Sequence, residues 1–359
     1  MTAPSLLHEN NWACTLSRIA SAVDIDATAR EHKAFLRPRG VRTASDQLRL
    51  ALAYGLGLSL RQGSAWAGAA NIADVSNPAL LRRLSNSADW LEAIAKRLVE
   101  DAQAQPSGEW AGHRLRLVDA TTLSQPGAKG TTWRLHVSYD LGGRVDGLEL
   151  TDNKGAEHLF RFSWRRGDIA IADRGYAKVA DFRAVIDGGA DLLVRIGWNA
   201  LRLSDAFGQP FDLFATLDKM DETPLSVPVQ VDTRAPDRSP LSLRLVIARL
   251  PEEQAEKARK KARDTARRKG KVIDPRTVRA AGFVMLLTSL PEQRSPQAVL
   301  DLYRLRWQIE LLFKRFKSLL GLGKLPAKSP KLARTWIFAK LIVALLVEKA
   351  ARMAAESFP

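Results

Sequence analysis

The sequence predicts an α/β protein with a helical N-terminal part, a core of alternating strands and helices, and an insertion within that core. Up to residue 108 the apolar residues recur every three or four positions, which is the period of an amphipathic helix. After it, short apolar runs are separated by turn residues, as in strands. A chain of 359 residues is too long for one simple hydrophobic core, so several domains are expected.

The composition indicates a globular protein with a polyanionic partner. Lys and Arg number 55 against 39 acidic residues, which gives a net charge of +16 and a pI near 10.2. Nucleic acid is the usual partner of such a surplus. Cys14 is the only cysteine, which excludes a disulfide framework and a cysteine zinc site. The N-terminus is too polar for a signal peptide and the run Ile342–Val347 is too short for a membrane span, so we expect a cytoplasmic protein without a membrane partner.

Residues 1–108 are expected to form a helical DNA-binding domain. Segment 60–86 resembles a helix-turn-helix, with small residues at 68–70 for the helix crossing and with Arg82 and Arg83 as candidate DNA contacts. A plain helical bundle with surface arginines is the alternative. The helices are predicted over Leu6–Val23, Ala27–Leu36, Ala44–Leu56, Leu60–Ala70, Pro78–Leu84 and Ser87–Glu100.

The core is assigned to residues 109–198 and 296–328. Its first part reads as three strands, a helix, a strand, a helix and a strand, which is the order of the ribonuclease-H-like fold. The helices are expected near Gly155–Phe160 and over Lys178–Ile186. The strands are predicted over His113–Asp119, Trp133–Leu141, Val145–Thr151, Asp168–Asp173 and Asp191–Ile196.

Residues 199–295 form a mainly β insertion, because this fold otherwise joins its parts by a short link. Its strands are predicted over Val227–Val231, Leu241–Ile247 and Phe283–Leu287. The basic run Lys257–Lys271 lies inside the insertion and holds nine basic residues and one acid. It is either a set of phosphate contacts, a mobile arm that orders on DNA, or an ordinary solvated charge run. Its candidate DNA contacts are Lys260, Lys261, Arg267 and Arg268.

The stretch Asp301–Leu320 has no proline or glycine and is predicted to be one long helix. Tyr303, Arg306, Glu310 and Lys317 fall on one edge of it at about 100° per residue. A carboxylate between cations and a phenol suits a metal and a phosphate. The alternative is a surface edge with ordinary pairing, such as Glu310 with the lysine four residues on.

Two aspartates complete a candidate metal site. Asp119 and Asp173 each end an apolar strand, where a carboxylate is costly unless a cation or an ionised partner meets it. Together with Glu310 they are suited to a pair of divalent cations that carry out phosphoryl transfer. Each aspartate alone could instead cap a strand end or a helix. Asp140, Asp152 and Asp168, at turns or strand starts, are not predicted to be ligands.

The spacing Tyr-x2-Arg-x3-Glu-x6-Lys from residue 303 resembles the signature of the family-four insertion-sequence transposases. The words Asp-Ala-Thr-Thr from residue 119 and Asp-Arg-Gly-Tyr from residue 173 resemble that family's two aspartate motifs. The resemblance implies a DNA transposase that cleaves and joins element ends, with Asp119, Asp173 and Glu310 as catalytic ligands of Mg²⁺ or Mn²⁺. It also implies that Tyr303, Arg306 and Lys317 contact DNA near the scissile phosphate.

The resemblance further implies transposon-end and target DNA as partners and a homodimer in the synaptic complex. Two alternatives stay open: a non-catalytic DNA-binding protein, including an inactive transposase remnant, and a metal-dependent nuclease without strand transfer. Residues 329–359 are predicted to form a C-terminal helix, expected to pack on the core domain or, alternatively, to pair two subunits.

Overall fold

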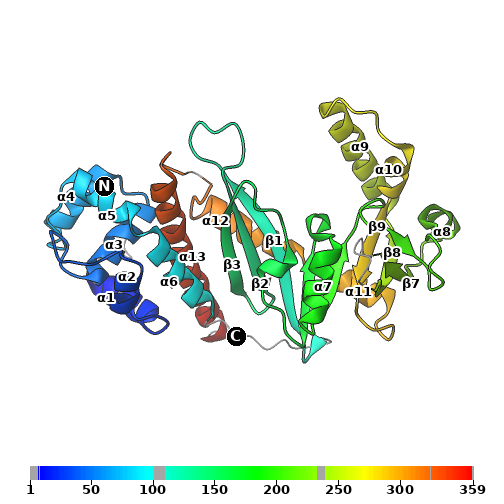
Figure 1. Ribbon diagram of the computed structural model, residues 1–359, viewed down its shortest axis with the longest axis horizontal. Coiled ribbons are helices and arrows are strands. Elements are labelled where there is room, and N and C mark those ends of the chain that lie inside the picture. Colours follow the sequence, from blue (N-terminus) through cyan, green and yellow to red (C-terminus); the bar gives the residue numbers. More distant parts are fainter. Residues whose placement is uncertain (1–6, 8, 101–109, 233–238, 324, 358–359) are drawn as a thin grey trace. The chain divides into compact units, whose positions relative to one another are not determined.

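The computed structural model describes residues 7, 9–100, 110–232, 239–323 and 325–357 (Figure 1). Its contacts divide the chain into two compact units. The first unit comprises Met1–Ala104, Ala120–Gly155 and Glu310–Pro359, and the second comprises Gln105–Asp119 and Ala156–Ile309. The boundary expected after residue 108 lies outside the described residues.

The six helices predicted for the N-terminal part are confirmed. Two of them begin with reciprocal capping boxes, in which Thr43 pairs with Asp46 and Ser59 pairs with Gln62. These side chains satisfy backbone N–H groups that have no partner within the helix, so the sequence fixes where α3 and α4 start. The helices are α1 (Glu9–Ala20), α2 (Ile25–Glu31), α3 (Ala44–Gly55), α4 (Leu60–Ala69), α5 (Asn77–Ser85) and α6 (Ala88–Glu100).

Helices α4 and α5 cross at a different residue from the three expected, 68–70. A Cβ on Gly63 would lie 3.2 Å from Leu80 Cδ2, whereas one on Gly68 would have no atom within 4 Å. The helix crossing therefore uses Gly63, and the expectation that residues 68–70 form it is wrong. Residues 70–76 connect the two helices, a longer connection than the three- or four-residue turn of a helix-turn-helix.

The C-terminal helix α13 (Pro330–Ser357) packs mainly on α6, α3 and α5 (Figure 1). A Cβ on Gly55 of α3 would stand 2.6 Å from Ala339 Cβ, so glycine allows the two helices to approach closely. The Thr335 hydroxyl donates to the Leu84 carbonyl across 2.6 Å. We expected this helix to pack on the core domain, and that expectation is wrong. The apolar face of α13 packs mainly on helices of the N-terminal bundle.

The first unit also holds the antiparallel strands β2 (Trp133–Asp140) and β3 (Arg144–Asp152). Strand β1 (Arg114–Leu123) passes from the second unit into the first after Asp119, and the strand order there is β3-β2-β1. All three strands lie where the sequence predicted them, although β1 is longer than predicted.

In the second unit, β1 pairs in parallel with β4 (Asp168–Ala172), and β4 pairs in parallel with β5 (Asp191–Arg195). Every residue of β4 is buried. The orders β3-β2-β1 and β1-β4-β5 are those of a ribonuclease-H-like core. Helix α7 (Val179–Asp187) is confirmed, whereas the helix expected near Gly155–Phe160 is only the 3-10 turn η3 (Leu159–Arg161).

The insertion extends this sheet beyond β5. The antiparallel strands β9 (Phe283–Thr288), β8 (Leu241–Arg249), β7 (Leu225–Val231) and β6 (Leu203–Ser204) follow β5 in that order. Three helices accompany them: α8 (Leu213–Lys219), α9 (Glu252–Arg268) and α10 (Pro275–Ala280). The basic run lies largely on α9, which extends away from the strands with α10 beside it (Figure 1).

The helix predicted over Asp301–Leu320 is broken in two, α11 (Pro296–Arg304) and α12 (Trp307–Ser318). At the break, the Leu305 N–H donates to the Leu302 carbonyl and the Arg306 N–H donates to the Tyr303 carbonyl, each across 3.1 Å. These three-residue bonds tighten the backbone into a 3-10 turn. Since no proline or glycine marks the turn, no local pattern in the sequence predicts it.

No helix in the described parts of the chain combines the length and the apolar character that a membrane-spanning segment needs.

Candidate active site

Three parallel strands of the second unit bring three charged residues side by side. The register pairs Val118 with Ala172 and Ala172 with Val194. The next residues along these strands are Asp119, Asp173 and Arg195. Since parallel strands advance together, these three residues lie at one edge of the sheet, just beyond the last paired residues.

Asp119 and Asp173 are both held in place. The Arg306 guanidinium donates to Asp119 Oδ2 across 3.4 Å, and both side chains are only 18% exposed. Asp173 Oδ1 accepts the Gly175 N–H across 2.8 Å and so caps the 3-10 turn η4 (Arg174–Tyr176). The Arg306 contact depends on the break between α11 and α12, where this arginine lies.

Tyr303 lies among the same charges. Burial raises the pKa of its phenol, and Asp173 raises it further, while Arg306 and Arg195 lower it. Loss of hydration and the neighbouring Arg195 lower the pKa of the Arg174 guanidinium. The signature residues Tyr303 and Arg306 therefore lie near Asp173 and Asp119 at the edge of the sheet, together with Arg174 and Arg195, which were not among the candidates from the sequence.

A cavity of about 670 Å³ opens next to this cluster, within the second unit. Asp173, Arg174, Arg195 and Arg306 line one part of it, and Lys261 of α9 lines another. Cations outnumber acids along this lining, so the cavity suits a polyanion.

An aromatic side chain forms part of the cavity wall. The Trp198 indole N–H donates to Thr277 Oγ1 across 3.1 Å, and the Arg276 guanidinium lies 4.6 Å from the centre of its ring. These contacts hold the indole plane in place, so the cavity combines charge with a fixed aromatic surface.

Glu310 and Lys317 lie on α12, in the part that belongs to the first unit. Both side chains are exposed. They are two helical turns apart and therefore occupy the same side of this helix. The opposite side buries Ile309, Leu312 and Phe316.

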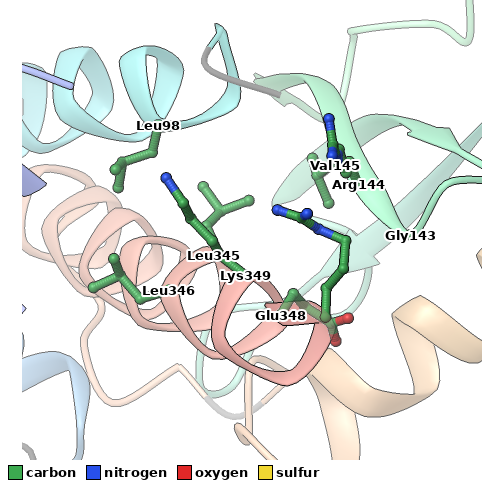
Figure 2. A pocket seen from close by; sticks show the side chains of 9 residues that line it. Leu98, Gly143, Arg144, Val145, Leu345, Leu346, Glu348 and Lys349 are labelled. Carbon is green, nitrogen blue, oxygen red and sulfur yellow. The ribbon is translucent and has the colours of Figure 1, made fainter. Parts of the chain in front are cut away.

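A separate small hollow in the first unit, of about 50 Å³, lies between α6, the β2–β3 turn and α13 (Figure 2). Arg144 and Val145 approach it from the hairpin, and Lys349 from α13. The Glu348 carboxylate at its edge accepts bonds from Arg315 across 2.9 and 3.1 Å. Its size, room for one or two waters, indicates a packing gap and not a substrate site.

Comparison with known proteins identifies the family of the chain. The family model described as "Transposase DDE domain" matches residues 110–346. The chain belongs to the DDE transposase family.

The chain is 42% identical to the transposase of insertion sequence element IS421 from Escherichia coli, over 94% of this chain and 93% of that protein. It is equally similar to the InsL protein of element IS186A from Escherichia coli strain K12, over the same shares of both chains. A more distant relative, the transposase of element IS231C from Bacillus thuringiensis subsp. berliner, is 26% identical over 64% of this chain and 54% of its own length.

Transposases of this family use divalent metal ions, and the residues present suit such ions. Asp119 and Asp173 offer carboxylate oxygens, the ligands that hard divalent cations prefer. Each is partly exposed, and the two directly follow Val118 and Ala172, which pair on neighbouring strands. Among the described residues, no three His, Cys, Asp or Glu side chains lie close enough together to hold one ion.

Asp168, an aspartate not expected to be a ligand, has a structural place in the transposase. It is 1% exposed and accepts two bonds from Arg114, each across 2.8 Å, and one from Arg116 across 3.2 Å. Its carboxylate is thus neutralised inside the unit, away from solvent.

The two candidate DNA contacts of α5 differ in their surroundings. Arg82 is exposed, and its Nε donates to the carbonyl of Pro78. The Arg83 guanidinium donates to the Arg39 carbonyl and lies 5.8 Å from the centre of the Phe35 ring. Burial lowers the pKa of Arg83. Arg82 is therefore the better placed of the two to reach DNA.

A signal for Arg195 was present in the sequence. Like Asp119 and Asp173, it is the charged residue at the end of an apolar strand. Once β4 and β5 are taken as parallel neighbours, the register places it next to Asp173. The candidates at strand ends were all carboxylates, so this cation was not among the predicted site residues.

Proposed function

We propose that this transposase cleaves and joins the ends of an insertion sequence with Asp119, Asp173 and Glu310 as its catalytic triad and with Mg²⁺ or Mn²⁺ as its metal. The observation that carries the proposal is the register of β1 and β4, which lines up Asp119 and Asp173 beside a cationic cavity. Glu310 is proposed as the third carboxylate because of its place in the Tyr-x2-Arg-x3-Glu-x6-Lys signature.

Two phosphoryl transfers account for cleavage and joining. In the first, a water oxygen bonds to the phosphorus at the element end and the 3′-oxygen leaves. In the second, that 3′-hydroxyl attacks a phosphodiester of the target, whose own 3′-oxygen leaves. Two divalent cations would activate the attacking oxygen and stabilise the leaving one.

The chain's own cations position the phosphate. Arg306 carries a forked guanidinium that can hold two phosphate oxygens, and it already lies 3.4 Å from Asp119. Tyr303 and Arg195, which approach Asp173, present a hydroxyl and a second guanidinium. These groups bind and orient the scissile phosphate and do not take part in bond exchange.

The direct test is incubation of the purified protein with the DNA that flanks its gene, with Mg²⁺, with Mn²⁺ and with EDTA. We expect metal-dependent nicks at the borders of an inverted repeat, followed by joined products when target DNA is added. Cleavage without joining would favour the nuclease, and tight binding without any cut would favour the non-catalytic protein.

We propose that residues 1–108 recognise the transposon ends, with Arg82 among the contacts, and that two copies of the chain hold both ends in the synaptic complex. The cytoplasm, where the DNA of a bacterial cell lies, is the expected location.

Lys317 is expected to contact a phosphate as a point charge. Replacement of Lys317 with alanine should weaken end binding and lower the slope of log K against log salt by about 0.9, the value for one phosphate contact. Binding measured by fluorescence anisotropy over a series of salt concentrations gives this slope. An unchanged slope would remove Lys317 from the DNA interface.

Helix α9 offers a matched pair of lysines for the same measurement. Lys257 is bound by Glu253 across 2.6 Å, whereas Lys260 and Lys261 have no acidic partner among the described residues. We expect Lys261→Gln to lower the salt slope by about 0.9 and Lys257→Gln to change it much less. Equal effects of the two variants would mean that only the net charge of α9 matters.

A further inference from the structure

Glu157 lies against the turn that follows Asp173. A Cβ on Gly175 would overlap Glu157 Oε2 and would stand 3.2 Å from Asp173 Oδ1. The two carboxylates therefore border the same backbone point, and glycine is the residue that leaves room for both. The backbone of Glu157 is fixed there, because its carbonyl accepts a hydrogen bond from Lys178 Nζ at the start of α7.

A buried hydroxyl lies next to the same carboxylates. Tyr176 is 0% exposed, and its hydroxyl has no hydrogen-bond partner among the described residues. Burial raises the pKa of this phenol, and the negative charges of Asp119, Glu157 and Asp173 raise it further. A buried hydroxyl without a partner destabilises the protein. The Tyr176 hydroxyl is such a donor, and the charges of the three carboxylates reach it.

We propose that Glu157 is a further acidic residue of the metal site, one that holds the divalent cation of Asp119 and Asp173 through water, with the Tyr176 hydroxyl donating into the same layer of water. The inference rests on the proposed function of Asp119 and Asp173. It takes the water-mediated form because no three acidic side chains of the described residues lie close enough together to ligate one ion directly.

The chemistry of the cation agrees with this placement. Mg²⁺ keeps several of its waters when proteins bind it, and those waters donate hydrogen bonds to carboxylates in the layer beyond the direct ligands. Such outer residues orient the ligands and contribute to metal affinity. Glu157 is therefore a positioning residue, and its effect should appear in metal binding before any DNA is present.

The first test is the affinity of the full chain for Mn²⁺, measured by the electron paramagnetic resonance of free Mn²⁺. Glu157→Gln preserves the shape of the side chain and removes its charge, and it should weaken Mn²⁺ binding about 10-fold or more. Asp187→Asn, at the exposed far end of α7, removes the same charge in the same unit and should leave the affinity unchanged. Equal affinities of Glu157→Gln and the native protein would overturn the inference.

The second test uses Tyr176→Phe, which removes only the hydroxyl. In EDTA this variant should melt at or above the temperature of the native protein, because it lacks the unsatisfied donor. On addition of Mn²⁺ its melting temperature should rise less than that of the native protein. An equal rise in both proteins would show that the hydroxyl has no part in metal binding.

Asp173→Asn separates the inference from the function on which it rests. If Asp173→Asn binds Mn²⁺ and cuts DNA like the native protein, the proposed function fails. If it loses both while Glu157→Gln binds Mn²⁺ normally, only the role of Glu157 fails. If Glu157→Gln melts at a lower temperature than the native protein in EDTA, Glu157→Asp is measured in its place. A Mn²⁺ affinity of Glu157→Asp between those of the native protein and Glu157→Gln supports the inference. An affinity equal to that of Glu157→Gln overturns it.

Discussion

Asp173→Asn is expected to abolish DNA cleavage and to leave binding of the transposon ends close to native. Asparagine keeps an Oδ1 atom for the Gly175 N–H, which Asp173 accepts across 2.8 Å, so the turn η4 should persist. What is lost is the negative charge that attracts a divalent cation. Removal of one member of a catalytic unit costs on the order of 10⁴-fold in rate.

The structure offers a closely matched control for this variant. Asp152, exposed at the end of β3, accepts the Lys154 N–H across 2.9 Å in the same arrangement. Asp152→Asn should therefore cut DNA at the native rate. Cleavage is followed on labelled end fragments with Mg²⁺, and binding is measured in EDTA. Loss of end binding in Asp173→Asn alone would assign Asp173 to folding instead of catalysis.

Asp168→Asn is expected to destabilise the protein severely. The variant would leave Arg114 and Arg116 without their anion inside the unit, where both now bind the Asp168 carboxylate. Removal of one partner of a buried ion pair costs about 3–5 kcal/mol. Unfolding in urea, followed by circular dichroism, measures this loss.

Asp187→Asn again serves as the control, since an exposed substitution changes the free energy of unfolding by about 0.5 kcal/mol at most. The control removes the same charge from the same unit. A stable Asp168→Asn protein that no longer cuts DNA would contradict the structural assignment and move Asp168 into the active site.

Much of the fold was accessible from the sequence because its elements are strongly periodic. The six N-terminal helices and the buried strands β4 and β5 lie within a few residues of their predicted bounds. Asp119 and Asp173 could be singled out as candidate ligands because a carboxylate after an apolar strand is unusual on energetic grounds. The comparisons then established the family independently of these residues.

The features that the sequence did not predict share one cause: each is determined by tertiary contacts and not by the local sequence. The turn at Leu305–Arg306 has no local breaker, and its arginine bonds to Asp119, which is far away in sequence. The apolar face of α13 is equally suited to a core or a bundle, and the close approach at Gly55 selects the bundle. Glu157 comes close to Gly175 only in the folded chain, so no local pattern in the sequence indicates its position.

The shared register of β1, β4 and β5 makes the active site sensitive to the number of residues in each strand. Substitution of one apolar residue by another within 168–172 changes packing but does not change the position of Asp173. Insertion or deletion of a single residue there would turn alternate side chains to the opposite face and carry Asp173 away from Asp119 and Arg195. Natural variation of these three strands should therefore be rich in exchanges and almost free of length changes.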